Sequence, residues 1–114
     1  VVDRVRNHTA AYFAERWSGL AEHPLVGEAR SVGLMAGLEI VRNKETRQRF
    51  DKGLGAGMRC RNTCIANGLV MRAVGDTMIV APPLVITDSE IDELVEKAWK
   101  SLDLTQKALE AEGA

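Results

Sequence analysis

Arg72 is the residue of this chain whose type and position most clearly indicate chemistry. It lies inside the apolar run 69–74, and a second apolar run, 77–81, follows after a Gly-Asp pair at 75–76. A guanidinium is always charged and rarely lies on an apolar strand without an anionic partner. Its planar fork can bind a carboxylate through two parallel hydrogen bonds. We expect either a ligand carboxylate at Arg72 or, as the alternative, an edge-strand arginine that reaches water or pairs with Glu39.

The other reactive side chains form no catalytic set in the sequence. His8 and His23 flank the first predicted helix in polar surroundings, and no serine or cysteine joins them in a triad pattern. A lysine that forms a Schiff base needs desolvation to lower its pKa. Every lysine here instead lies in a polar run or on the solvent-exposed face of a predicted helix. These lysines are Lys44, Lys52, Lys97, Lys100 and Lys107. We therefore predict no catalytic residue in this chain.

The two cysteines, Cys60 and Cys64, lie four residues apart on a predicted helix. This spacing fits disulfide geometry poorly, and no further thiolates or imidazoles stand nearby to complete a metal site. We expect reduced thiols, no metal site, and a reducing, cytoplasmic compartment.

Two segments could be taken for phosphate-binding sites. Glycines fill positions 53, 55 and 57, but the ten residues before them are hydrophilic and the lysine of a P-loop is absent. The basic residues Lys44, Arg47 and Arg49 alternate with acidic ones, which favours a solvated loop. We expect no cofactor-binding residue in this chain.

Length and charge indicate one globular domain. The chain has 114 residues, of which 46% are hydrophobic, and its net charge is −1. No run is long enough to span a membrane, and the balanced charge gives no footprint for nucleic acid or an acidic membrane. Residue 1 is not methionine and residues 1–5 have the pattern of a helix interior, so we expect a piece of a larger protein rather than a processed product.

The apolar pattern predicts the element order α-β-β-α-β-β-α. The fold class is α+β, with helices packed on a small, mostly antiparallel sheet. A capping box, Thr87 with Glu90, marks the start of the last helix. The expected elements are a helix over 2–20, one strand or two over 26–41, a polar connection over 43–52 anchored by Phe50, a helix over 53–67, a hairpin over 69–81 ended by Pro82-Pro83, and a helix after Thr87.

Two of these elements carry predictions about which side chains are buried. Over 32–40 the even positions, Val32 among them, form an unbroken apolar face, with a possible bulge at Gly33. Gly33 and Gly37 on the other face indicate that another backbone, a helix or a ligand approaches closely. In the helix over 53–67, the predicted stripe is Leu54, Met58, Arg61 and Ile65.

Three segments of the chain resemble the C-terminal small domain of class III pyridoxal-phosphate aminotransferases. They are Gly33–Glu39, Asn67–Leu84 with its double proline, and Thr87–Leu94. Within that class the likeness is greatest to the bacterial ω-amine:pyruvate and putrescine:pyruvate transaminases. The resemblance covers nearly all of residues 1–114.

The resemblance implies a fold-type I enzyme, usually a homodimer, that moves an amino group from an amine to pyruvate or another keto acid through pyridoxal 5'-phosphate. It implies that Arg72 binds the substrate carboxylate and swings aside for an amine that lacks one. The lysine that binds the cofactor belongs to the large domain of the same protein, which this chain lacks. The isolated chain is therefore expected to be inactive.

Two alternatives from other classes stay open at this point. One is a stand-alone module that captures a small carboxylate at Arg72 as a sensor or regulatory subunit. The other is a scaffold or dimerisation fragment without a ligand.

Overall fold

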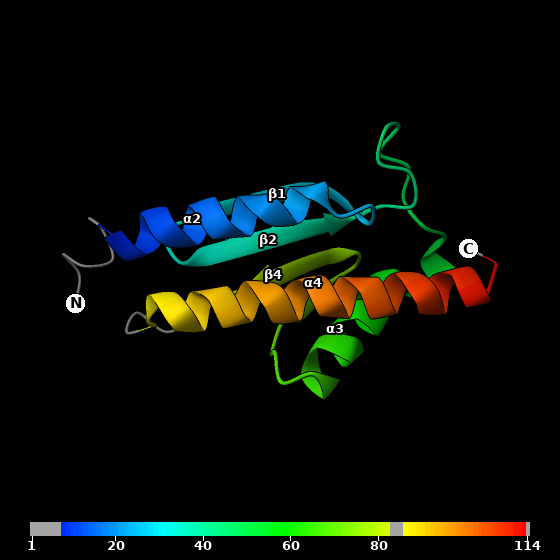
Figure 1. The fold of residues 1–114 in the computed structure, drawn as a ribbon. Helices are drawn as coiled ribbons and strands as arrows, with labels where there is room; N and C mark the ends of the chain where they lie inside the picture. The colour runs from blue at the N-terminus through cyan, green and yellow to red at the C-terminus, as the bar shows by residue number, and fades with distance from the viewer. Residues whose placement is uncertain (1–7, 83–85, 114) are drawn as a thin grey trace.

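The computed structural model describes residues 8–82 and 86–113, which form helices packed on one face of a four-stranded antiparallel sheet (Figure 1). The predicted α+β class and element order are confirmed. The predicted helical residues 2–7, and the hairpin-ending Pro83, lie outside the described residues. The helices are α2 (Ala10–Ser18), α3 (Ala56–Ala66) and α4 (Asp88–Ala111), with short 3-10 turns η2 (Gly19–Glu22) and η3 (Lys52–Leu54); the strands are β1 (Val26–Val32), β2 (Met35–Ile40), β3 (Arg72–Val74) and β4 (Thr77–Val80).

The strands lie in the order β1-β2-β4-β3, so that β1 and β3 form the two edges. Residues 33–34 form a tight turn between β1 and β2, and Gly33 has a φ of +60°, which suits glycine. The prediction of one continuous strand, or of a bulge at Gly33, is therefore wrong: the chain reverses there. The register irregularity of this pair lies between Val26 and Glu28 instead.

The turn at Gly33 also changes which side chains are buried. Ala36, Leu38 and Ile40 are buried as predicted, and they point toward the helices. Val32 was predicted on the same face, but it is 85% exposed and pairs with Met35 on the opposite side. The even-number pattern fails at this residue because a chain reversal restarts the alternation.

The buried face of α3 differs from the predicted stripe. Met58 and Ile65 are exposed, and the buried residues are the small ones Ala56, Gly57, Cys60 and Cys64. A helix with small side chains on one face can approach its neighbour closely, and α3 lies against α4 and the β3–β4 hairpin. Phe50, the predicted anchor of the preceding connection, is buried as expected.

Cys60 and Cys64 are free and buried on that face of α3. The hydrogen bond with Cys64, together with burial, raises the pKa of the Cys60 thiol, and the same bond lowers the pKa of Cys64. The Cys64 thiol also lies 3.7 Å from the sulfur of Met71, at the start of the hairpin. Both cysteines thus serve as core side chains, with Thr105 of α4 beside Cys60 and Ser101 of α4 beside Cys64.

Helix α4 begins at the predicted capping box. The N–H of Glu90 donates to Oγ1 of Thr87 at 3.2 Å, and the N–H of Thr87 donates to the Glu90 carboxylate at 2.9 Å. These bonds to the backbone and the hydroxyl of Thr87 hold the pKa of Glu90 below its ordinary value. Helix α4 then supplies much of the core through Ile91, Leu94, Val95, Ala98 and Leu102.

His23 is fully buried, contrary to the prediction of polar surroundings. Its Nδ1 accepts from the N–H of Leu25 at 3.1 Å, so the proton is on Nε2, which donates to Asp103 at 2.8 Å. The edge of the ring meets Trp99, with ring centroids 4.8 Å apart. His23 therefore links the segment after η2 to α4 and is a structural residue.

None of the helices in the described part of the chain is long and apolar enough to cross a membrane.

Candidate functional site

Arg72 is the first residue of β3, an edge strand of the sheet. The preceding Met71 is buried, whereas Arg72 is exposed, because successive side chains of a strand point to opposite faces. Arg72 pairs with Ile79 of β4, and directly paired residues point to the same side of a sheet. The guanidinium therefore belongs to the sheet face that no described helix covers.

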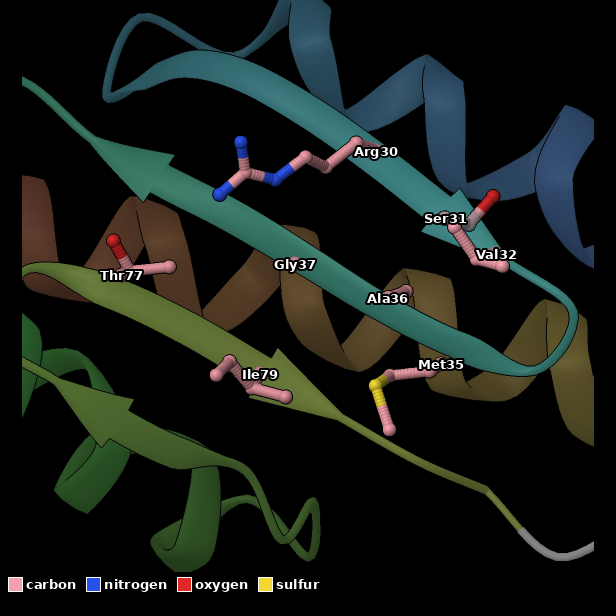
Figure 2. Close-up of a pocket in the computed structure, with 8 residues that line it drawn as sticks. All are labelled: Arg30, Ser31, Val32, Met35, Ala36, Gly37, Thr77 and Ile79. Atoms are coloured by element: carbon pink, nitrogen blue, oxygen red, sulfur yellow. The ribbon is translucent and has the colours of Figure 1, made fainter.

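One cross-strand row places Arg72 in line with a second arginine. Arg30 pairs with Gly37, Gly37 pairs with Ile79, and Ile79 pairs with Arg72. The row crosses all four strands, so the two arginine backbones lie at opposite edges, about 14 Å apart at the usual strand spacing. Figure 2 shows Arg30, Gly37 and Ile79 on this face.

The two arginines differ in their partners. Nη1 of Arg30 donates to the carboxylate of Glu28 at 3.1 Å. Glu39, the alternative partner considered for Arg72, instead lies 3.6 Å from Arg47 and 3.4 Å from Arg49. In residues 8–82 and 86–113, Arg72 forms no ion pair. Its fork is thus available to an anion from outside the described part of the chain.

A groove of about 230 Å³ lies on the same face, beside the Arg72 row. Its floor is Gly37, where the missing side chain leaves the strand surface open, with Arg30 of β1 on one side and Ile79 of β4 on the other (Figure 2). The complete lining is Arg30, Ser31, Val32, Met35, Ala36, Gly37, Thr77 and Ile79.

Asp76 fixes the hairpin that carries Arg72, a role that the sequence pattern did not reveal beyond its place in the turn. Its carboxylate accepts from the N–H of Gly57 at 3.0 Å, and its backbone carbonyl accepts from the N–H of Ile40 at 2.9 Å. One residue therefore joins the turn to the first turn of α3 and to β2. No local sequence pattern indicates this bond, because 19 positions separate Gly57 from Asp76.

The chemistry that this geometry supports is binding. An exposed guanidinium, without an ion pair among the described residues, is held on a strand whose turn is fastened at two points. Its backbone position is therefore fixed while its long stem can move. In the described part of the chain, no three His, Cys, Asp or Glu side chains are placed to hold a metal ion.

The class III aminotransferase family model matches residues 2–102 of this chain. The chain belongs to the class III aminotransferase family. The match includes α2, α3, the whole sheet with Arg72, and α4 as far as Leu102.

Individual class III aminotransferases agree with this assignment. The putrescine–pyruvate aminotransferase of Pseudomonas aeruginosa is 58% identical over 110 residues, which is 96% of this chain and 24% of that protein. The crystal structure of the omega-transferase from Vibrio fluvialis JS17 superposes with a TM-score of 0.89 at 36% identity, covering 96% of this chain and 26% of that one. The crystal structure of a PLP-bound aminotransferase mutant from Vibrio fluvialis superposes with a TM-score of 0.87 at 35% identity. The superposition covers 93% of this chain and 23% of that one.

The chain therefore spans about a quarter of the length of these relatives.

Proposed function

We propose that residues 1–114 are the C-terminal small domain of a PLP-dependent transaminase, which transfers an amino group from an amine such as putrescine to pyruvate. The 58% identity to a putrescine–pyruvate aminotransferase supports the substrates, and the likeness to a PLP-bound aminotransferase supports the cofactor. The observation that carries the proposal is Arg72, which has no ion pair in the part of the chain that the structure describes and lies on the hairpin that resembles the family's carboxylate-binding hairpin.

In this proposal Arg72 binds the carboxylate of pyruvate. A bidentate pair between a guanidinium and a carboxylate fixes the orientation of the acid as well as its position. Putrescine has no carboxylate, so the same pocket must also accept an uncharged carbon chain. A charged fork on a long flexible stem can move out toward water when no anion is present, because β3 is an edge strand and Arg72 is exposed.

The residues described here do not fit PLP itself. The α3 N-terminus, where a phosphate would be favoured, already has the Asp76 carboxylate 3.0 Å from the N–H of Gly57. Lys97 forms an exposed ion pair with Glu93 at 3.0 Å, and Lys44 donates to the backbone carbonyl of Ala21. A lysine that bonds covalently to the cofactor needs a desolvated site. The cofactor is therefore assigned to the remaining part of the protein, and this chain alone is expected to be inactive.

Two further properties belong to the same proposal. The protein is cytoplasmic, which two free, buried cysteines support because a reducing compartment keeps thiols unpaired. The complete enzyme is a homodimer, an expectation that derives from the family resemblance.

The test is the kinetics of Arg72→Ala in the complete protein that contains this chain. We expect the KM for pyruvate to rise at least about 100-fold, since each of the two hydrogen bonds in a bidentate pair contributes about 1.5–3 kcal/mol. The KM for putrescine should change only a few-fold, because an amine gives the guanidinium no anionic partner. Arg61→Ala, on the outer side of α3, is the matched control and should leave both values unchanged.

If Arg72→Ala raises the KM for pyruvate and for putrescine equally, or raises neither, the role of Arg72 is contradicted. Absence of any aminotransfer by the unmodified complete protein contradicts the activity itself.

A further inference from the structure

The side chains on the approach to Arg72 already alternate between the core and the solvent. Leu69 and Met71 are buried, whereas Val70 and Arg72 are exposed. Met71, which directly precedes Arg72, therefore points to the opposite side of the backbone. The contacts that hold Met71 in the core also fix the backbone from which the guanidinium extends.

Cys64, in the last turn of α3, contacts this segment at two points. Its thiol lies 3.7 Å from the sulfur of Met71, and its backbone carbonyl accepts from the N–H of Leu69 at 2.8 Å. Cys64 and Met71 are 1% and 2% exposed. In a close-packed interior a side chain cannot grow without displacing its neighbour. The size of the side chain at position 64 therefore sets the room that is left for Met71.

The far end of the same segment is attached to the other end of α3. In the hairpin turn, the carboxylate of Asp76 accepts from the N–H of Gly57, in the first turn of the helix, at 3.0 Å. Helix α3 in turn packs against α4. Because α3 holds the segment 69–76 at both ends, a displacement of Met71 is passed to the short stretch between the attachments, which contains Arg72.

Cys60 lies one turn earlier on the same buried face of α3, but its surroundings differ. It is also 1% exposed, and its thiol is beside Cys64 and beside Thr105 of α4. The two cysteines are thus equally buried, and the structure places one against α4 and the other against the approach to Arg72. This difference makes Cys60 a matched control for Cys64.

We propose that Cys64 is a positioning residue for Arg72: through Met71 it sets the place of the guanidinium and, with it, the affinity for the substrate carboxylate. The proposal rests on the proposed function, because Cys64 acts on the same site. A fork that holds both oxygens of a carboxylate depends on exact geometry. A displacement of about 1 Å can cost about 100-fold in such an arrangement. An amine such as putrescine gives the guanidinium no anion, so its use does not depend on this placement.

The experiment compares Cys64→Leu with Cys60→Leu in the complete protein, by steady-state kinetics with pyruvate and putrescine. Both substitutions add volume at a buried position of one helix, so both strain the packing. Cys64→Leu should raise the KM for pyruvate about tenfold, as a displacement of a fraction of an ångström requires, and leave kcat and the KM for putrescine unchanged. Cys60→Leu should leave both KM values unchanged. A merely structural role would instead lower the amount of active enzyme, and so reduce kcat without changing KM.

Three further variants test the same contact. Cys64→Ser conserves the size of the side chain and places a hydroxyl beside Ser101, so it should retain the wild-type KM for pyruvate. Cys64→Val adds less volume than leucine, should raise this KM by less, and replaces Cys64→Leu if that variant does not fold. Met71→Ala combined with Cys64→Leu makes room for the added carbons and should bring the KM for pyruvate back toward the wild-type value.

Hydrogen exchange of the complete protein gives a reading that needs no turnover. Peptides that contain 72–74 should exchange faster in Cys64→Leu than in Cys60→Leu, because the strand that carries Arg72 is displaced only in the former. Equal exchange in the two variants overturns the proposal, and so does an equal effect of the two on the KM for pyruvate. The two failures are distinguishable. Aminotransfer with no difference between the variants refutes only the role of Cys64, whereas a difference in exchange without aminotransfer by the unmodified protein refutes only the function.

Discussion

The carboxylate of Asp76, in the hairpin turn, accepts a hydrogen bond from the main-chain N–H of Gly57 at the start of α3, with 3.0 Å between the two atoms. The same relationship brings the two backbones into contact, since a Cβ on Gly57 would lie 2.0 Å from the carbonyl oxygen of Gly75. The hairpin that carries Arg72 is thus fastened to a helix at its turn. Four predictions follow from this and from three other contacts.

Asp76→Ala should lower the free energy of unfolding by about 1 kcal/mol, the usual contribution of a side chain that caps a helix N-terminus. Asp76→Asn retains an oxygen that can accept the bond, so it should lose less. Chemical denaturation of this chain measures both. In the complete protein, Asp76→Ala should also raise the KM for pyruvate more than that for putrescine, because the hairpin positions Arg72. Equal stability of the alanine and wild-type chains contradicts the capping role.

Gly57→Ala should destabilise the chain by about 1–3 kcal/mol, as overpacking does in a close-packed region. Alanine normally stabilises a helix relative to glycine, so the sign of the effect is diagnostic. Gly19→Ala is the control, since a Cβ there meets nothing within 4 Å and its φ is −62°. Thermal unfolding of the two variants gives the comparison. A Gly57→Ala chain as stable as Gly19→Ala would show that the turn can move away freely.

Trp17→Phe should cost about 1–3 kcal/mol of stability, since it removes the N–H that donates to the carbonyl of Gly37 at 3.1 Å and leaves a gap in the core. Trp17 is fully buried. Trp99→Phe is the matched control. Because Trp99 is 37% exposed, this substitution should lower the free energy of unfolding by less. Denaturant titration of each variant, followed by the fluorescence of its remaining tryptophan, measures the two losses of stability separately. The reverse order of the two losses is incompatible with this packing.

Glu90→Gln should reduce stability at neutral pH and make no difference in strong acid. The folded-state pKa of Glu90 is depressed below its ordinary value of 4.5 by hydrogen bonds from Thr87. A depressed pKa adds stability above the unfolded value, and that stability is lost as the pH falls through the folded value. Melting temperatures of both chains measured from neutral to acidic pH should therefore converge on acidification. A difference in melting temperature that stays constant at all pH values would show that the loss of stability comes from the changed shape of the side chain rather than from its charge.

Local patterns were sufficient for those parts of the fold whose contacts lie close together in the chain. The Thr87–Glu90 capping box needs only a four-residue spacing, and the Gly75-Asp76 turn needs only two residues between two apolar runs. The place of Arg72 inside a short strand was likewise predicted from the apolar run around it. These features could be predicted because the physical cause acts over a few residues.

The sequence by itself determined the α+β class, the capping box, the hairpin and the presence of one arginine on an apolar strand. Only the tertiary structure decided that the chain reverses at Gly33, that His23 is buried, and that α3 buries its cysteines instead of Met58 and Ile65. It also decided that Arg47 and Arg49 pair with Glu39, so that Arg72 has no ion pair within residues 8–82 and 86–113. These outcomes depend on which distant segments share a surface, and hydrophobic burial and charge pairing depend on those neighbours rather than on position in the chain.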